Sequence, residues 1–334
     1  MSGRIIGFLV LCAAIFLAGA APAQEARQFK IGTGEIGGTY YPIGQTIAAI
    51  VGTPMGERAC FRGPACGVPG LTTVALTSQG SKENVEGVAG GWMDAGFVQS
   101  DVAFWAYSGT GVYAGEKPYA KLRALASLYP ESVHLVVRTG AGIASLAGLR
   151  GRRVALGDRE SGTLVGARLV LAEAGIDESR DFKPHYIAPD DAAAKLALGE
   201  LDAFFIVAGY PALNVSRVVW SRDARVLPID RAVIAAAIKK HRYFSAGEIP
   251  RQVYGNAQPI PTLDVHALMV VSEAADSDLI YRVTQALWRE SARNRFASGH
   301  SKGLRVTLET ALKGIGIPLH PGAARYYREI GKLK

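Results

Sequence analysis

The segment Phe29–Val51 predicts a short strand, a glycine-rich turn and an amphipathic helix in succession, a unit that can build a small-anion site from backbone N–H groups. Glycines permit the tight turn and leave room for a ligand that a Cβ atom would obstruct. The glycines of the turn are Gly32, Gly34, Gly37 and Gly38. Pro42 suits a first helical turn, and the apolar residues at helical spacing are Ile43, Ile47, Ile50 and Val51. The turn is expected to bind a ligand, with a purely structural turn as the alternative.

The same turn matches the dinucleotide-binding fingerprint, Gly32-x-Gly34-x-x-Gly37. That fingerprint expects an acidic residue about 20 positions later, at the end of a second strand. Glu57 instead lies in a stretch rich in Pro and Gly. A turn for another kind of ligand is therefore favoured, no cofactor is expected, and a nucleotide-dependent oxidoreductase remains a lesser alternative.

The first 23 residues are typical of a secretory signal peptide. They carry one charge, Arg4, followed by an apolar run that ends at the small-residue site Ala21-Pro22-Ala23. Cleavage is expected near Ala23, and Cys12 lies inside the removed segment. No other stretch has the roughly 18 apolar residues of a membrane helix. The mature protein is expected to be soluble and periplasmic.

Export also bears on the two remaining cysteines, Cys60 and Cys66, which flank a short Gly/Pro-containing loop. An oxidising compartment favours a disulfide between them, and two free thiols are the alternative. No metal site is expected, because the histidines show no HExxH or other ligand spacing. The formal net charge of +8 is spread along the chain without an aromatic-interleaved basic patch, so nucleic acid is not an expected partner.

Beyond the first unit, short apolar runs alternate with polar turns and helical stretches. The runs are Val74–Leu76, Ala95–Val98, Val154–Leu156 and Ala203–Val207. This alternation predicts an α/β protein with mostly parallel sheets flanked by helices. In such sheets ligands bind beyond the carboxyl ends of the strands, where these turns lie.

The length of the chain suits two lobes, since about 310 residues remain after cleavage. Leu125–Arg138 is expected to cross from one lobe to the other, and the return is expected near Arg225–Asp230 or along Pro259–Ser272. Helices within Asp276–Phe296 and Pro321–Lys332 would complete the first lobe. The expected division is 24–132 with 260–334 for lobe 1 and 133–259 for lobe 2. Such lobes can close on a ligand.

Several segments together resemble the TAXI family of extracytoplasmic solute-binding proteins, the receptors of one class of TRAP transporters. They are GTGEIGGTYYPIG, TSQGSKEN, GFVQSDVAFWAYSG, LRALASLYPESVHLVVR, LAGLRGRRVALGDRESGT and LGELDAFFIVAGYP, which follow in order along nearly the whole mature chain. The resemblance implies a type II periplasmic binding protein fold and a ligand cleft between two lobes. It also implies a monomer that delivers glutamate, glutamine or a related carboxylate to TRAP membrane subunits.

The resemblance further implies a set of ligand-binding residues. They are Gly37, Gly38, Thr39, Tyr40, Ser78, Ser81, Gln99, Ser100, Asp101, Ser161, Gly162, Thr163, Gly209, Tyr210 and Pro211. The chain departs from its relatives at Glu35-Ile36 and at Glu160, where small residues are common. Carboxylates near the cleft would argue against a ligand identical to glutamate.

The residue types suggest what each position could do. Ser161-Gly162-Thr163 precedes a helix expected over Leu164–Ala174, so its amides could hold a carboxylate, or its hydroxyls could simply cap the helix. Asp101 could accept a ligand ammonium or cap its own helix. Gln99 could serve either end of an amino acid or bond structurally at a strand end. Tyr40 and Tyr210 suit a cleft wall or the core, and Ser78 and Ser81 suit contact or a plain turn.

Catalysis lacks a nucleophile, since neither Ser81 nor Ser161 stands in a G-x-S-x-G elbow. The favoured interpretation is therefore a solute receptor that is not an enzyme. A ligand-sensing subunit for a membrane signalling protein remains an alternative of another class.

Overall fold

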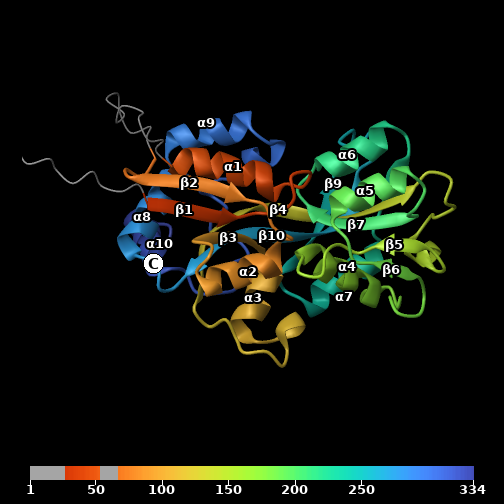
Figure 1. The fold of residues 1–334 in the computed structure, drawn as a ribbon, viewed down its shortest axis with the longest axis horizontal. Coiled ribbons are helices and arrows are strands. Elements are labelled where there is room, and N and C mark those ends of the chain that lie inside the picture. Colours follow the sequence, from red (N-terminus) through yellow and green to blue (C-terminus); the bar gives the residue numbers. More distant parts are fainter. Residues whose placement is uncertain (1–26, 53–66) are drawn as a thin grey trace, which may run out of the picture.

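The computed structural model describes residues 27–52 and 67–334. The expected signal peptide and the cysteines Cys12, Cys60 and Cys66 lie outside these ranges. Two α/β lobes are joined through one ten-stranded sheet of order β2-β1-β3-β10-β4-β7-β5-β6, with β8 beside β4 and β9 beside β10 (Figure 1). The α/β class predicted from the alternating pattern is therefore confirmed.

The elements have the following bounds. The strands are β1 (Arg27–Gly32), β2 (Leu71–Leu76), β3 (Ala95–Gln99), β4 (Leu122–Arg138), β5 (Arg153–Ala155), β6 (Lys183–His185), β7 (Ala203–Ala208), β8 (Ala224–Leu227), β9 (Phe244–Ile249) and β10 (Ile260–Ser272). The α-helices are α1 (Tyr40–Val51), α2 (Ser81–Gly90), α3 (Ser100–Ser108), α4 (Gly162–Glu173), α5 (Pro189–Ala197), α6 (Leu213–Trp220), α7 (Arg231–Lys240), α8 (Ser277–Leu287), α9 (Glu290–Ser298) and α10 (Pro321–Glu329). Short 3₁₀ helices are η1 (Gly111–Tyr113), η2 (Leu146–Leu149) and η3 (Ser301–Arg305).

The two longest strands, β4 and β10, run from one lobe into the other and pair antiparallel. Near its start β4 pairs with the first-lobe part of β10, and from Ser132 onward it pairs with β7 of the second lobe. The expected crossing segment therefore lies in one continuous strand, although it contains Pro130. Of the two expected returns, Pro259–Ser272 coincides with β10, whereas the Arg225–Asp230 region contributes β8, which pairs with β4 inside the second lobe.

Parallel pairing occurs within each lobe, away from the crossing strands. In the first lobe β1 pairs parallel with β2 and β3, and in the second β5 pairs parallel with β6 and β7. The carboxyl ends of β1, β3 and β7 consequently come together where the lobes meet, which is where ligands bind in sheets of this kind.

Side chains alternate between the two faces of the sheet along each strand, and the central strands β3 and β7 are buried on both faces. On β10, Met269 joins the cluster under α1 and α8, whereas the next residue, Val270, joins the cluster under α2 and α3. On β7, Phe205 and Phe204 divide in the same way between two second-lobe clusters. Each lobe therefore has its own core on both sides of the shared sheet.

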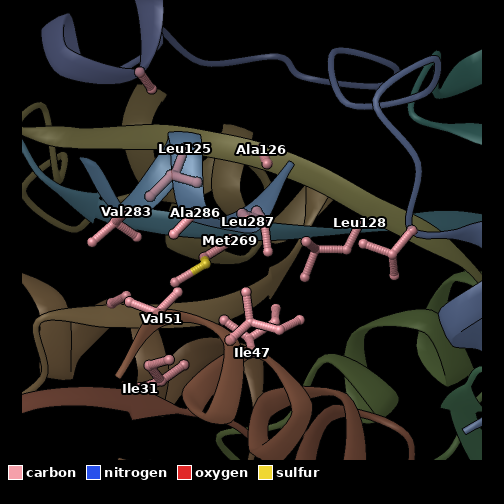
Figure 2. Close-up of a cluster of buried hydrophobic side chains, with 14 of the residues drawn as sticks. Ile31, Ile47, Val51, Leu125, Ala126, Leu128, Met269, Val283, Ala286 and Leu287 are labelled. Carbon is pink, nitrogen blue, oxygen red and sulfur yellow. The ribbon is translucent and has the colours of Figure 1, made fainter. Parts of the chain in front are cut away.

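The first-lobe core combines side chains from the early helix α1 with side chains from the late helices α8 and α10 (Figure 2). Ile47 and Val51 of α1 lie in the same cluster as Leu125 and Met269 of the crossing strands and Val283 of α8, and all five are fully buried. The periodicity of α1 is thus explained by the face that it buries. The C-terminal helices α8 and α10 pack in this core, next to elements more than 200 residues earlier in the chain.

Within residues 27–52 and 67–334, no helix is both long and apolar enough to cross a membrane.

Replacing Ile47 with Ala should destabilise the first lobe by about 2–5 kcal/mol, because the site is closely packed and cannot collapse around the lost atoms. Urea unfolding followed by circular dichroism measures this change. Leu198→Ala is the matched control, since Leu198 is 75% exposed and its truncation should change the free energy of unfolding by less than about 0.5 kcal/mol. Equal effects of the two substitutions would contradict the assigned core.

Candidate ligand-binding cleft

A cavity of ≈ 50 Å³ lies between the two lobes, at the carboxyl ends of β1, β3 and β7. Its lining residues come from both lobes. They are Gly34, Glu35, Gly38, Thr39, Tyr40, Gln79, Gly80, Ser81, Gln99, Glu131, Ser161, Gly162, Thr163, Pro189, Ile206, Val207 and Ala208. Since one ordered water needs about 10–15 Å³ of such volume, the cavity holds a few waters or a very small molecule in this closed arrangement.

The sequence-predicted site residues divide into two groups. Those that line the cavity are Gly38, Thr39, Tyr40, Ser81, Gln99, Ser161, Gly162 and Thr163. Those that lie elsewhere are Gly37, Ser78, Ser100, Asp101, Gly209, Tyr210 and Pro211. Sequence reasoning did not select Glu131, Gln79, Gly80, Pro189 or the end of β7, all of which line the cavity.

The N-terminus of α4 faces the cavity and is capped by Ser161. The Ser161 Oγ accepts a hydrogen bond from the Leu164 N–H at 3.1 Å and donates to the Asp158 carbonyl at 2.6 Å. The Thr163 Oγ1 accepts from the Val207 N–H at 3.1 Å, which ties the start of α4 to the end of β7. Both hydroxyls thus form hydrogen bonds within the protein. The first N–H groups of α4 have no acceptor within the helix itself, and they favour an anion at this end.

Gln99 reaches the same helix end from the other lobe. A Cβ atom on Gly162 would lie 2.5 Å from Cδ of Gln99, so the two residues are in close contact across the cleft. The Gln99 backbone N–H donates to Ser81 Oγ at 3.1 Å. Its side-chain Oε1 is buried and has no hydrogen-bond partner within the described residues. Gln99 therefore brings an unused acceptor to the cavity.

Glu131 is the buried carboxyl group of the cavity, carried by the middle of β4. Tyr40 donates its hydroxyl hydrogen to Glu131 Oε2 at 2.7 Å, and Glu131 is only 1% exposed. Burial raises the pKa of Glu131 to about 8, because the charged form loses its water. The sequence signal was present, as Glu131 is the one carboxylate inside the long apolar strand segment 125–138.

Asp101 lies next to this site without lining the cavity. It is fully buried, and neither carboxyl oxygen has a hydrogen-bond partner within the described residues. Burial raises its pKa to about 7. Asp101 is the second residue of α3, whose N-cap is Gln99, so it does not occupy the cap position. Its ligand role remains a prediction.

Of the two departures from the family pattern, Glu35 faces the cavity and Glu160 does not. Glu35 Oε2 accepts from the Asp190 N–H at 3.0 Å, across the lobes. Burial, reinforced by the neighbouring carboxylates of Asp190 and Asp158, raises the pKa of Glu35 to about 8. Glu160 instead forms an ion pair with Lys82 at 2.8 Å.

The lobes touch at several further points around the cavity. The Thr39 hydroxyl donates to the Gly209 carbonyl at 2.9 Å, and Nζ of Lys302 lies 3.4 Å from the centre of the Tyr210 ring. Ser301 Oγ donates to the Tyr210 carbonyl at 3.1 Å. The 209–211 loop therefore meets the first lobe directly in this closed arrangement, and contact of this loop with a ligand remains a prediction.

Ser78 behaves as a turn residue. Its hydroxyl lies 2.9 Å from the Thr33 carbonyl and 2.8 Å from Oδ1 of Asn84, and it accepts from the Gly80 N–H at 3.1 Å. These contacts hold the loop before α2 against the end of β1. In the described ranges, no group of three or more His, Cys, Asp or Glu side chains is placed to hold a metal ion.

Two α/β lobes that share crossing strands, with a cavity between them, form a two-lobed binding-protein fold. Three solved structures share this fold. A protein of Bordetella bronchiseptica RB50 is 20% identical, with a TM-score of 0.53 over 92% of this chain and 82% of that one. MatC of Rhodopseudomonas palustris, solved with bound malate, is 13% identical, with a TM-score of 0.53 over 81% and 88%. A binding-protein component of an ABC phosphonate transporter from Pseudomonas aeruginosa is 11% identical, with a TM-score of 0.50 over 84% of each chain.

The chain itself belongs to the NMT1-like family, which matches residues 31–331. The match covers both lobes and every loop that lines the cavity.

The raised pKa of Glu131 gives a testable pH dependence. Below its ordinary value of 4.5 the carboxyl is protonated in the folded and unfolded states alike. Between 4.5 and about 8 only the unfolded chain releases the proton, so stability falls as pH rises, by at most about 1.4 kcal/mol per pH unit. Glu131→Gln removes this loss and should be more stable than the unmodified protein by an amount that grows from pH 4.5 to pH 8.

Thermal unfolding of both proteins at matched pH values measures that difference. Because all other titrating groups are shared, the difference between the two curves isolates residue 131. A gap that stays constant across this pH range would contradict the raised pKa.

Proposed function

We propose that the protein is the extracytoplasmic solute-binding receptor of a TRAP-type transporter of the TAXI kind, a binding component rather than an enzyme. It would act as a periplasmic monomer, capture a small carboxylate such as glutamate, glutamine or a dicarboxylate, and deliver it to the membrane subunits. The observation that carries the proposal is the cavity between the lobes, lined by loops of both and faced by the N-terminus of α4. The TAXI resemblance of the loop sequences supports the transporter class.

The chemistry of the cavity supports a carboxylate ligand. Helix N-termini bind anions through free N–H groups and the helix dipole. MatC is solved with malate and the Pseudomonas protein belongs to a phosphonate transporter, so two proteins of this fold handle small anions. The proposed lobes, 24–132 with 260–334 and 133–259, are supported by the separate cores on either side of the cleft, except that Leu263 and Val265 of β10 pack in the second-lobe core.

The glycine-rich turn is better explained by contacts within the protein than by a dinucleotide. A Cβ atom on Gly32 would collide with the Met93 side chain, and one on Gly37 with the Asp190 carboxylate. The Gly37 N–H donates to Asp190 Oδ2 at 3.2 Å. The turn thus serves the meeting of the lobes, which favours a closing receptor over an oxidoreductase.

A thermal-shift screen of the refolded, ligand-stripped protein tests the proposal. The panel contains amino acids, dicarboxylates and nicotinamide nucleotides. A carboxylate present at 100 times its Kd should add about 2.7 kcal/mol of stability, because it binds only the folded protein. A rise with nucleotides alone would overturn the proposal in favour of the oxidoreductase.

Gly162→Ala should weaken binding of the best carboxylate without harming the fold. The added Cβ would press on Gln99 when the lobes close, which costs about 1–3 kcal/mol, or about 5- to 150-fold in Kd. In the open protein Ala suits the first turn of α4 better than Gly does. Isothermal titration calorimetry measures the affinity, and the melting temperature of the ligand-free variant reports the fold.

Gly148→Ala is the control, since a Cβ there makes only an ordinary contact, at 3.4 Å from Ile143, in a 3₁₀ helix that does not line the cavity. Its affinity should match that of the unmodified protein. Unchanged affinity in Gly162→Ala would show that closure does not bring these two residues together.

A further inference from the structure

The carboxyl groups of the cavity have no basic partner in its lining. Glu35 and Glu131 are the acidic side chains among its lining residues, and no Lys, Arg or His of the described chain is among them. The N-terminus of α4 can hold one carboxylate. A second carboxylate on the same ligand would meet no cation and would face acidic side chains instead. The cavity therefore suits a ligand with one negative group rather than two.

Glu131 has one oxygen free for a ligand. Tyr40 has a single hydroxyl hydrogen, which it donates to Oε2. Within the described residues no protein donor reaches Oε1, although Glu131 lines the cavity and is almost fully buried. An unpaired buried carboxylate is costly, whereas one that meets a cation is well satisfied.

Gln99 supplies a second acceptor in the same cavity. Its Oε1 is buried without a partner, and its side chain lies against Gly162 at the start of α4. An ammonium group has three donors and no acceptor, so it suits a pair of unused acceptors. The same Gln99 amide also lies beside the proposed carboxylate position. The cavity lining thus offers hydrogen-bond acceptors for a cation next to hydrogen-bond donors for an anion.

The other charged groups near Glu131 do not replace such a ligand. Asp101 and Asp264 are acidic and raise the pKa of Glu131, while Lys302 lowers it. Lys302 is nevertheless outside the cavity lining, with its Nζ on the face of the Tyr210 ring. Tyr129, which also influences Tyr40, is neutral and buried. A cation to pair with the ionised form of Glu131 therefore has to come with the ligand.

We propose that the ligand is a zwitterion carrying a protonated amine beside one carboxylate, and that Glu131 selects it, with Gln99 as the second acceptor. This inference rests on the proposed receptor function and narrows its ligand class. Small neutral amino acids such as alanine and serine are favoured over dicarboxylates and hydroxy acids, because the cavity has a volume of only ≈ 50 Å³. Glu131 acts on specificity by contact with the amine.

Matched probe pairs test the inference, since each pair differs only in an amine against a hydroxyl. Suitable pairs are L-alanine with L-lactate, L-serine with L-glycerate and L-glutamate with L-2-hydroxyglutarate, and L-glutamine and succinate complete the panel. Calorimetry of the mature protein should give amines that bind at least about 100-fold more tightly than their hydroxy partners. Glu131→Gln should reduce this ratio by at least about tenfold.

Asp264→Asn is the matched control. Asp264 lies opposite Ser132 on the neighbouring strand, and its Oδ1 accepts a hydrogen bond from the Ser132 hydroxyl at 2.6 Å. It does not line the cavity. The substitution removes a nearby negative charge outside the cavity, so the amine preference should change by less than about threefold. An equal loss of preference in both variants would mean that general electrostatics, and not contact with Glu131, sets the selectivity.

Proton release gives a second readout that a merely structural Glu131 would not produce. Near pH 7 the empty site holds Glu131 largely protonated, and pairing with an ammonium requires the carboxylate form, so amine binding should release protons. Titrations in phosphate and in Tris buffer measure this release, because the two buffers differ in ionisation enthalpy. Glu131→Gln should reduce the release, and the remainder would report on Glu35.

The outcomes separate the two levels of the proposal. Tight binding of succinate or of the hydroxy acids, with Glu131→Gln without effect on the ratio, would overturn the zwitterion inference and leave the receptor standing. Failure of every carboxylate in the panel to bind would overturn both.

Discussion

The antiparallel pairing of β4 with β10 is the constraint on which the rest of the molecule depends. These strands bring the two halves of the chain into one sheet, with β3 beside β10 on one side and β7 beside β4 on the other. Because β10 belongs to the last third of the chain, the first lobe cannot be completed until α8 and α10 have packed over α1. The geometry of the cleft follows from the same pairing, since it sets where the ends of β1, β3 and β7 meet.

Around that frame, the cleft is built from short loops whose polar groups serve either the protein or the cavity. Ser161, Thr163 and Ser78 use their hydroxyls to hold loops and helix ends in place. Backbone N–H groups, Gln99 and Glu131 are left for the space between the lobes. This division explains how the site can be rigid while some of its polar groups keep unused hydrogen-bonding capacity, because the groups that hold its shape are not those that face the cavity.

How far the sequence predicts this arrangement depends on how local each signal is. The β1–α1 unit and the start of α4 were predictable, because glycines, a capping serine and helical periodicity act within a few residues. The role of Glu131 was not, because it arises only when β4 is paired on both sides and Tyr40 arrives from 91 positions away. Family resemblance selected the 209–211 loop, yet its contacts with Thr39 and Lys302 depend on how the lobes meet, which no local pattern encodes.

The position of Glu131 in the middle of β4 has a consequence for the energetics of the empty receptor. Glu131, which we propose pairs with the ligand's ammonium group, is carried by the strand that connects the lobes. Ligand binding and the relative position of the lobes therefore both affect the environment of this residue. Without a ligand, closure buries a carboxyl group that must keep its proton, and water entering an open cleft relieves that requirement. An arriving ammonium would take over the role of that water. For the proposed ligand class, the cargo itself would supply the counter-charge that this buried acid lacks.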